Sequence, residues 1–280
     1  MNDRTPSDIG VRELEAVARK LRGQIIRMIA AAGSGHCGGS LSAVDILTYL
    51  YFRELRIRPN EPRWPERDRF LLSKGHCAPA LYAVLAERGY FPKEKLWTLR
   101  GIESTLQGHP DMRKTPGVDM TTGSLGQGFS CAVGIALAGK LDRKDYRVYV
   151  VLGDSELQTG LLWEAAMMAR QQGLDHLVAI IDNNKLQSDG VTKTIVDIEP
   201  IAEKWRAFGW EARRIDGHDF GQIHAAVVQS KSANGQPKVI IADTVKGKGV
   251  SFMEGLVSWH SGAPNPQQTA AALHELEARA

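Results

Sequence analysis

The sequence predicts an α/β fold of three layers, α/β/α, in which helices cover both faces of a mostly parallel central sheet. Short β-branched runs alternate with helical stretches of about ten residues, which is the pattern of βαβ units. Glycine or acidic residues follow these runs, at the strand ends where such sheets bind ligands. With 280 residues, of which 43% are hydrophobic and 24% charged, the chain can bury a sizeable core and is not a disordered protein.

The chain is predicted to begin with two helices. Apolar residues recur at three- and four-residue steps over residues 8–32, which places them on one face of an amphipathic helix. Ser7 is its expected N-cap. Residues 42–52 form the second predicted helix, which is largely apolar and is opened by Ser40 or Ser42.

The middle of the chain combines short elements with a long loop. A strand is expected over residues 69–73, a helix over 79–87 and a short helical piece over 93–99. Residues 107–122 hold prolines, glycines and acidic turn signals without a sustained period, which indicates a loop. Residues 125–141 are small and apolar on all sides, which is typical of a buried helix.

The second half alternates strands and helices more regularly. The predicted strands are residues 146–152, 177–181, 211–215 and 238–245, and the predicted helices are residues 161–172, 201–208 and 220–230. Residues 264–280 are expected to form a Pro-containing turn and a short Ala-rich helix, a tail suited to docking on a partner.

Charge and cysteine content exclude several classes of protein. The formal net charge is +3 and no basic block is present, so no nucleic-acid partner is expected. No apolar run is long enough to span a membrane, and residues 1–20 lack the apolar segment of a signal peptide. Cys37, Cys77 and Cys131 are odd in number and widely spaced, which argues against a disulfide framework and predicts a cytoplasmic protein.

Glycine makes up 28 residues and is concentrated in residues 33–39 and 123–128. Several histidines directly follow a glycine or lie close to one: His36, His76, His109, His218 and His260. One such histidine alone would be interpreted as a surface or packed residue. Their repeated placement favours a site, because glycine lets the backbone approach a ligand and imidazole exchanges protons near neutral pH. No C-x-x-C or H-x3-H spacing is present, so structural zinc is not expected.

The strongest signal lies between two predicted strand ends. One strand ends at Gly153-Asp154 and the next at Asp182-Asn183-Asn184, with 28 residues, 155–182, between Asp154 and the asparagine pair. If the strands are adjacent, a carboxylate and an amide meet at one edge of the sheet, and their oxygens suit Mg²⁺ or Ca²⁺. The helix after Gly153 can direct N–H groups at an anion. The spacing therefore predicts a cation site beside a diphosphate.

This segment resembles the fingerprint of thiamine-diphosphate (ThDP) enzymes, in which Gly-Asp-Gly is followed at a similar distance by Asn-Asn. Further motifs resemble those of transketolases and occur in the same order. They are Gly35-His36-Cys37-Gly38-Gly39-Ser40-Leu41-Ser42, Leu72-Ser73-Lys74-Gly75-His76, Gly108-His109-Pro110, Thr122-Gly123-Ser124-Leu125-Gly126-Gln127-Gly128 and Lys246-Gly247-Lys248-Gly249-Val250. The resemblance covers residues 11–265, and the sequence is identified as a member of the transketolase family.

The resemblance implies a ThDP-binding fold, formed as a single diphosphate-binding domain over residues 1–280 with 264–280 as its tail. It implies that Asp154, Asn184 and the backbone carbonyl of Leu186 ligate Mg²⁺, with Ca²⁺ or Mn²⁺ as alternatives. The residues expected to touch ThDP are Gly153 and Ser155 on the diphosphate, Gly123, Ser124 and Leu125 along the cofactor wall, and His76 and His260. The histidines matching the family's catalytic ones are His36, His76, His109 and His260.

The resemblance also implies a partner, because the chain resembles only the N-terminal, diphosphate-binding module. The pyrimidine-binding module, with the glutamate that activates the aminopyrimidine ring, would be a separate C-terminal subunit. The expected enzyme is a dimer of heterodimers that transfers a two-carbon ketol unit from a ketose, such as a sugar phosphate, to an aldose. Imidazoles suit the required proton transfers from the ketose C3 hydroxyl and to the aldehyde oxygen.

Three positions depart from the family pattern. Ser155 replaces the second glycine of the fingerprint, Thr159 replaces a glutamate linked to contacts between active sites, and Cys37 replaces a proline. They favour a paralogue acting on a non-standard sugar (unphosphorylated, branched or sulfonated) or a catalytically weakened partner subunit. The α subunit of a 2-oxoacid dehydrogenase is a further alternative, which the Gly-His motifs and residues 246–250 disfavour.

Overall fold

The computed structural model describes residues 9–278. Its centre is a five-stranded sheet with the order β1-β2-β3-β5-β4 in which all neighbouring strands are parallel. The strands are β1 (Arg69–Leu72), β2 (Val148–Gly153), β3 (Leu177–Asn183), β4 (Glu211–Asp216) and β5 (Lys238–Asp243). All five predicted strands are therefore confirmed, and β3 runs on through Asp182 and Asn183.

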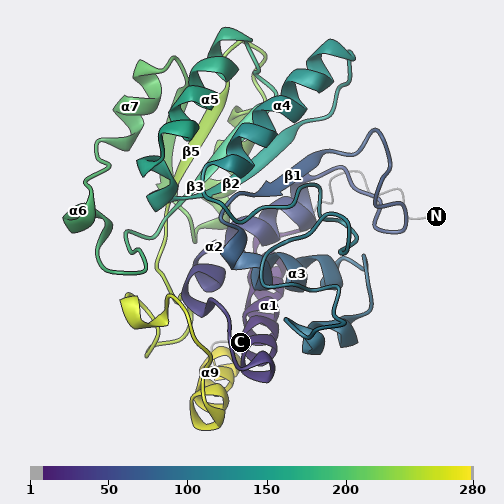
Figure 1. The fold of residues 1–280 in the computed structure, drawn as a ribbon, viewed down its shortest axis with the longest axis vertical. Coiled ribbons are helices and arrows are strands. Elements are labelled where there is room, and N and C mark those ends of the chain that lie inside the picture. Colours follow the sequence, from purple (N-terminus) through teal and green to yellow (C-terminus); the bar gives the residue numbers. More distant parts are fainter. Residues whose placement is uncertain (1–8, 279–280) are drawn as a thin grey trace.

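Helices cover both faces of the sheet, which confirms the three-layer α/β/α prediction (Figure 1). The helices of one core are α1 (Val11–Ala32), α2 (Cys37–Tyr49), α3 (Ala78–Glu87) and α8 (Phe220–Gln229). The helices of the other core are α4 (Gln127–Leu141), α5 (Gly160–Gln171) and α7 (Ile201–Ala207). The strand β2 joins the two layers, because Tyr149 and Val151 belong to the first core and Val148 and Val150 to the second. Such strands are apolar on both faces.

Several short helical segments extend the longer helices or lie between the other elements. They are a π-helical segment at Leu50–Glu54, the helix α6 (Thr192–Ile195) and 3-10 segments at Gly75–Cys77, Lys93–Thr98, Asp154–Gln158 and Val257–Trp259. Residues 107–122 contain neither helix nor strand, as predicted.

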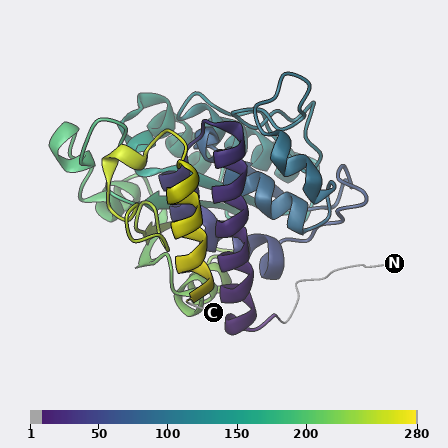
Figure 2. The same ribbon diagram turned by 90° about the horizontal axis from the view of Figure 1, so that it is seen from below.

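The C-terminal helix α9 (Pro266–Ala278) lies alongside α1 (Figure 2). Its Ala272 and Leu276 are buried in the core that α1 also lines. The expected tail therefore packs on this chain's own first helix.

The starts of α1 and α2 differ most from the sequence prediction. The helix α1 begins at Val11 with Gly10 at its N-cap, and Ser7, the expected N-cap, lies outside the described residues. The helix α2 begins at Cys37 and not at Ser40 or Ser42. Its first turn therefore contains Gly38, at which a Cβ would lie 2.8 Å from the Trp259 carbonyl oxygen. The close approach of another segment explains why glycine stands inside a helix.

The helix α4 also differs from its prediction. Its Phe129, Ala132 and Ala136 are buried, but Gly134 and Ala138 are exposed. The expectation of burial on all sides is wrong for the chain alone, because helices and sheet of this chain cover only one side of α4.

None of the helices within residues 9–278 combines the length and the hydropathy needed to cross a membrane. Cys37, Cys77 and Cys131 are free thiols.

Candidate active site

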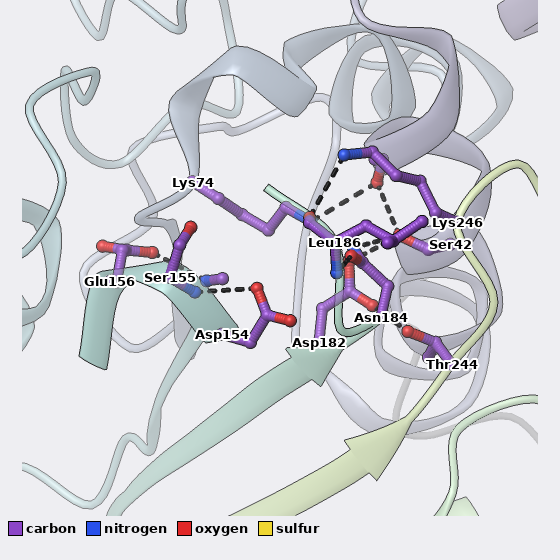
Figure 3. A network of polar contacts seen from close by, with 12 residues as sticks. Ser42, Lys74, Asp154, Ser155, Glu156, Asp182, Asn184, Leu186, Thr244 and Lys246 are labelled. Atoms are coloured by element: carbon purple, nitrogen blue, oxygen red, sulfur yellow. Dashed lines mark hydrogen bonds and ion pairs between the residues drawn. The ribbon is translucent and has the colours of Figure 1, made fainter. Parts of the chain in front are cut away.

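The predicted meeting of two strand ends is present at the carboxyl edge of the sheet. Gly153 of β2 and Asp182 of β3 are paired in the parallel register, so Asp154 and the segment after β3 lie side by side. The Asp154 carboxylate accepts a hydrogen bond of 2.6 Å from the Lys185 backbone N–H and one of 2.7 Å from that of Ser155. Figure 3 shows Asp154 and Asp182 near each other at this edge of the sheet.

Asp154 is only 2% exposed, and the hydrogen bonds that it accepts come from backbone N–H groups and the Thr192 hydroxyl. Burial raises the pKa of Asp154 to about 6, and the nearby Asp182 carboxylate adds to the shift. The positive charge of Lys74 offsets only part of this shift. A bound divalent cation would supply the remaining positive charge.

The segment after β3 presents two further oxygen atoms suited to a cation, the side-chain oxygen of Asn184 and the backbone carbonyl oxygen of Leu186. The Asn184 side-chain oxygen accepts from the Leu186 backbone N–H at 3.1 Å. Between them, Lys185 has a φ of +66°, in the left-handed region that residues with a Cβ seldom adopt. Such backbone strain is concentrated at ligand sites. Sequence reasoning did not detect this conformation, which has no signal beyond the Asn-Asn pair.

Asp154, Asn184 and the Leu186 carbonyl fit a hard divalent cation, because all three offer oxygen. Within residues 9–278 no group of three or more His, Cys, Asp or Glu side chains is arranged to hold a metal. Any cation at this edge therefore depends on the amide and the backbone carbonyl as well as on the carboxylate.

A buried ion pair lies beneath this edge and was missed by the sequence analysis. The Lys74 ammonium contacts the Asp182 carboxylate, and both side chains are almost fully buried. Burial opposes the charge of Lys74, but Asp182 outweighs it and raises the Lys74 pKa. Burial likewise opposes ionisation of Asp182, but Lys74 and hydrogen bonds from Ser42 and Thr244 hold its pKa below the ordinary value. The motif around Lys74 and the acid before the Asn-Asn pair were the available signals.

Lys246 is a second cation that the sequence analysis did not assign. Its ammonium donates to the carbonyl oxygens of Leu186 at 3.1 Å and Gln187 at 3.0 Å, and lies 2.9 Å from His260 Nδ1. Burial lowers the pKa of Lys246 to about 8, and Lys74 adds to this effect. A carbonyl oxygen has two lone pairs, so the Leu186 contact leaves one for another partner.

Three of the predicted histidines form a cluster. The ring centroids of His36 and His76 are 5.2 Å apart, those of His36 and His260 5.4 Å, and those of His76 and His260 5.5 Å. They come from the start of α2, the turn after β1 and the 3-10 segment before α9, three positions far apart in sequence. Gly39 allows the close approach of two of these segments, since a Cβ there would lie 2.7 Å from Cys77 Sγ.

The clustered histidines are neutral at physiological pH. Burial lowers the pKa values of His36 and His260 to about 4, with nearby cations contributing, and lowers that of His76 well below the ordinary value. Neutral imidazoles can accept protons as well as donate them.

His109 lies beside the cluster on the 107–122 loop. The residue is exposed overall, but its ring is partly covered, and this partial burial, followed by the charge of Arg100, lowers the His109 pKa. A Cβ at Gly123 would lie 3.4 Å from the His109 ring, so the loop and the Gly123–Leu125 wall are in contact. His218 lies elsewhere: its Nδ1 is 2.7 Å from Asp45, and its Nε2 accepts from the Val245 N–H at 2.9 Å.

Glu156 connects the Gly123–Leu125 wall to the strand end, and the sequence analysis missed it. This fully buried carboxylate accepts from the backbone N–H groups of Gly126 and Gly153, both at 2.8 Å, and from the Ser73 hydroxyl. Ser155 precedes it and is half-buried. Thr159 caps the turn, with its hydroxyl donating to the Glu156 carbonyl at 2.8 Å. The wall and the Gly153 turn are therefore held as one unit.

A parallel α/β sheet with a carboxylate–amide edge, a Gly-rich wall and a histidine cluster defines a ThDP-binding enzyme of the transketolase class. Residues 14–276 match the family model described as "Transketolase, thiamine diphosphate binding domain". The chain belongs to this family.

Relatives of similar length are named as subunits of divided transketolases. The chain is 50% identical to the 6-deoxy-6-sulfo-D-fructose transketolase subunit SqwG of a Clostridium species, over 95% of this chain and 96% of that protein. It is 41% identical to an apulose-4-phosphate transketolase subunit of Phocaeicola vulgatus, over 96% of this chain and 95% of that protein.

The transketolase of Campylobacter jejuni has a solved structure that matches with a TM-score of 0.91 and 32% identity. The match covers 96% of this chain but only 43% of that one. The chain thus spans less than half of an undivided transketolase. It is the N-terminal, ThDP-binding subunit of a split transketolase, a ketol-transferring transferase.

Proposed function

We propose that this chain, loaded with ThDP and a divalent cation and paired with a pyrimidine-binding subunit, transfers a two-carbon ketol unit from a ketose to an aldose. The supporting observation is that the candidate cation ligands and the histidine cluster are joined by one residue. The Lys246 ammonium contacts both the Leu186 carbonyl oxygen, beside Asn184, and the His260 ring, which lies next to that of His36. When bound, ThDP supplies the nucleophilic carbon and the electron sink for breaking the ketose C2–C3 bond.

In this proposal Asp154, Asn184 and the Leu186 carbonyl hold Mg²⁺, and Ca²⁺ or Mn²⁺ can replace it. Gly153 and Ser155 lie on the diphosphate, with the partly exposed Ser155 hydroxyl as a donor that a glycine would lack. Lys246 offsets the diphosphate charge, because its ammonium already lies next to the Leu186 carbonyl.

The histidines carry the proton transfers. His36, His76, His109 and His260 have lowered pKa values, so each is ready to accept a proton from the ketose C3 hydroxyl and to return one to the aldehyde oxygen. His76 and His260 also contact ThDP, and Gly123, Ser124 and Leu125 form the wall along it.

We propose a sugar with an anionic group as the substrate. The two relatives above are named for a sulfonated and a phosphorylated sugar. The higher identity to the sulfofructose enzyme favours a sulfonate. A branched sugar phosphate is the second candidate, supported by the apulose-4-phosphate relatives, and an unphosphorylated sugar is the remaining arm of the test.

The assembly proposed is a dimer of heterodimers in the cytoplasm, with no nucleic-acid partner. The free state of the three cysteines supports a reducing compartment. We further propose that residues 1–280 form one domain with 264–280 as its tail, supported by the burial of α9 residues against α1.

The deciding experiment is a reconstitution. The chain is assayed alone and with its pyrimidine-binding subunit, in the presence of ThDP and Mg²⁺, on phosphorylated, sulfonated and unmodified ketoses with an aldose acceptor. We expect no ketol transfer by the chain alone and transfer by the complex. Activity of the chain alone would contradict the divided active site, and an inactive complex that binds ThDP would favour a weakened partner subunit.

A further inference from the structure

The Asn184 side chain can coordinate a cation only through its amide oxygen, so cation binding depends on which way the amide group points. In the structure the amide nitrogen, Nδ2, faces the Ser42 hydroxyl at 3.3 Å. The oxygen, Oδ1, faces the opposite way and accepts from the Leu186 N–H. Figure 3 shows Ser42, Asp182 and Asn184 together at the end of β3.

The hydrogen inventory around Ser42 allows only this direction. A serine hydroxyl has one proton, and the nearest group to Ser42 Oγ is the Asp182 carboxylate at 2.6 Å. A carboxylate can only accept, as can the Gly39 carbonyl at 3.1 Å. Whichever of the two takes the proton, the Ser42 oxygen is left as an acceptor. It therefore bonds the Asn184 nitrogen and would repel the Asn184 oxygen.

Asp182 is itself fixed. Lys74 contacts one oxygen of its carboxylate and the Thr244 hydroxyl donates to the other. A buried ion pair is weak evidence for stability, because apolar residues of similar size often serve as well. Its place directly beneath the candidate cation ligands, with Ser42 as the connecting group, suits a positioning role.

We propose that Ser42 is a positioning residue for the cation site, and that the Lys74–Asp182 pair fixes the hydroxyl proton of Ser42. The result is an Asn184 amide whose oxygen is presented to the cation before the cation arrives. This inference rests on the proposed role of Asn184 as a metal ligand.

The test measures Mn²⁺ affinity of the ThDP-loaded two-subunit complex from the electron paramagnetic resonance signal of free Mn²⁺. Ser42→Ala should weaken Mn²⁺ binding about 10–100-fold, as for loss of a group that orients a metal ligand. Ser42→Thr, which retains the hydroxyl, should restore most of the affinity.

A double-mutant cycle separates orientation from general damage. A carboxylate presents an oxygen in either direction, so in the Asn184→Asp background Ser42→Ala should change Mn²⁺ affinity less than about twofold. Ser40→Ala is the matched control, because Ser40 lies on the same helix, is fully buried and has a hydroxyl without a hydrogen-bond partner among the described residues. It should leave Mn²⁺ affinity unchanged.

The outcomes are distinct. Unchanged Mn²⁺ affinity in Ser42→Ala, or an equal loss in both Asn184 and Asn184→Asp backgrounds, overturns the positioning role and leaves the proposed function intact. A wild-type complex that binds ThDP but no Mn²⁺ overturns the cation site and the positioning role together.

Discussion

Asp154 is a buried carboxylate whose short hydrogen bonds come from backbone N–H groups. Desolvation and the neighbouring Asp182 disfavour its charge and raise its pKa. A divalent cation relieves this cost, whereas at an exposed carboxylate it would replace only water. Among the candidate ligands Asp154 is therefore the one to which cation binding should be most sensitive.

We expect Asp154→Asn to weaken Mg²⁺-dependent ThDP binding to the two-subunit complex by more than about 100-fold, a larger loss than for a group that only orients a ligand. Titration calorimetry at fixed Mg²⁺ measures it. Asp142→Asn is the control, because Asp142 is exposed at the far end of α4. Equal ThDP affinity in Asp154→Asn and wild type would remove Asp154 from the site.

The histidine cluster gives stability a pH dependence of defined sign. The pKa of His36 falls from its ordinary 6.5 to about 4, mainly by burial. Between these values the unfolded chain binds more protons at this residue than the folded chain does, so the free energy of unfolding decreases as the pH falls. His260, whose pKa is also about 4, acts in the same direction.

His36→Gln should therefore flatten the decline of the free energy of unfolding between pH 6.5 and 4, measured by urea denaturation of the chain at several pH values. His274→Gln, a change at an exposed histidine of α9, should leave the slope as in wild type. An unaltered slope in His36→Gln would mean that the pKa of His36 is the same in the folded and unfolded chains.

At the scale of elements, the conformation of the loop after β5 places Lys246 in the candidate site. Gly247 has a φ of +80°, and a Cβ there would lie 2.3 Å from the Met253 carbonyl oxygen. The Gly247 N–H donates to the Gly38 carbonyl at 3.0 Å, which ties the loop to the start of α2. A residue with a side chain cannot occupy this position unless Met253 or the loop that carries Lys246 moves.

Gly247→Ala should lower the free energy of unfolding by about 3 kcal/mol, because overpacking adds to backbone strain. Gly255→Ala is a matched control in the same loop: φ is +70°, but nothing lies within 4 Å of its Cβ position. Strain alone should cost it about 1 kcal/mol. Urea denaturation compares the two, and equal losses would show that the Met253 contact is unimportant.

At the scale of the whole molecule, the described chain carries the candidate cation ligands, but part of the proposed site is open to solvent. His109 and Ser124 are exposed. In the proposed complex, the second subunit would cover this open part of the site and exclude water from the reaction.

Saturating Mg²⁺ and ThDP should raise the Tm of the two-subunit complex by several degrees more than that of the chain alone, because ligand stabilisation follows affinity. Differential scanning fluorimetry with and without cofactor measures both shifts. Magnesium without ThDP is the control. An equal shift for chain and complex would mean that this subunit binds the cofactor fully by itself.

The sequence by itself was enough to predict the three α/β/α layers and the two strand ends that carry Asp154 and Asn184. Period-two and period-3.6 patterns depend on neighbouring residues, so β2 and β3 could be placed, and with them Asp154 and Asn184. Helix starts were less predictable, because α2 begins at Cys37, where packing against the Trp259 segment decides the backbone and local preference does not.

Only the tertiary structure decided which distant residues meet. Lys74 and Asp182 are 108 positions apart, and Ser42 and Asn184 are 142 apart. Whether a lysine is a surface charge or a buried partner depends on what the other strands and helices bring next to it, which no local pattern contains. The polar contacts that orient the ligands are consequences of the three-layer packing, and so they become visible only in the folded chain.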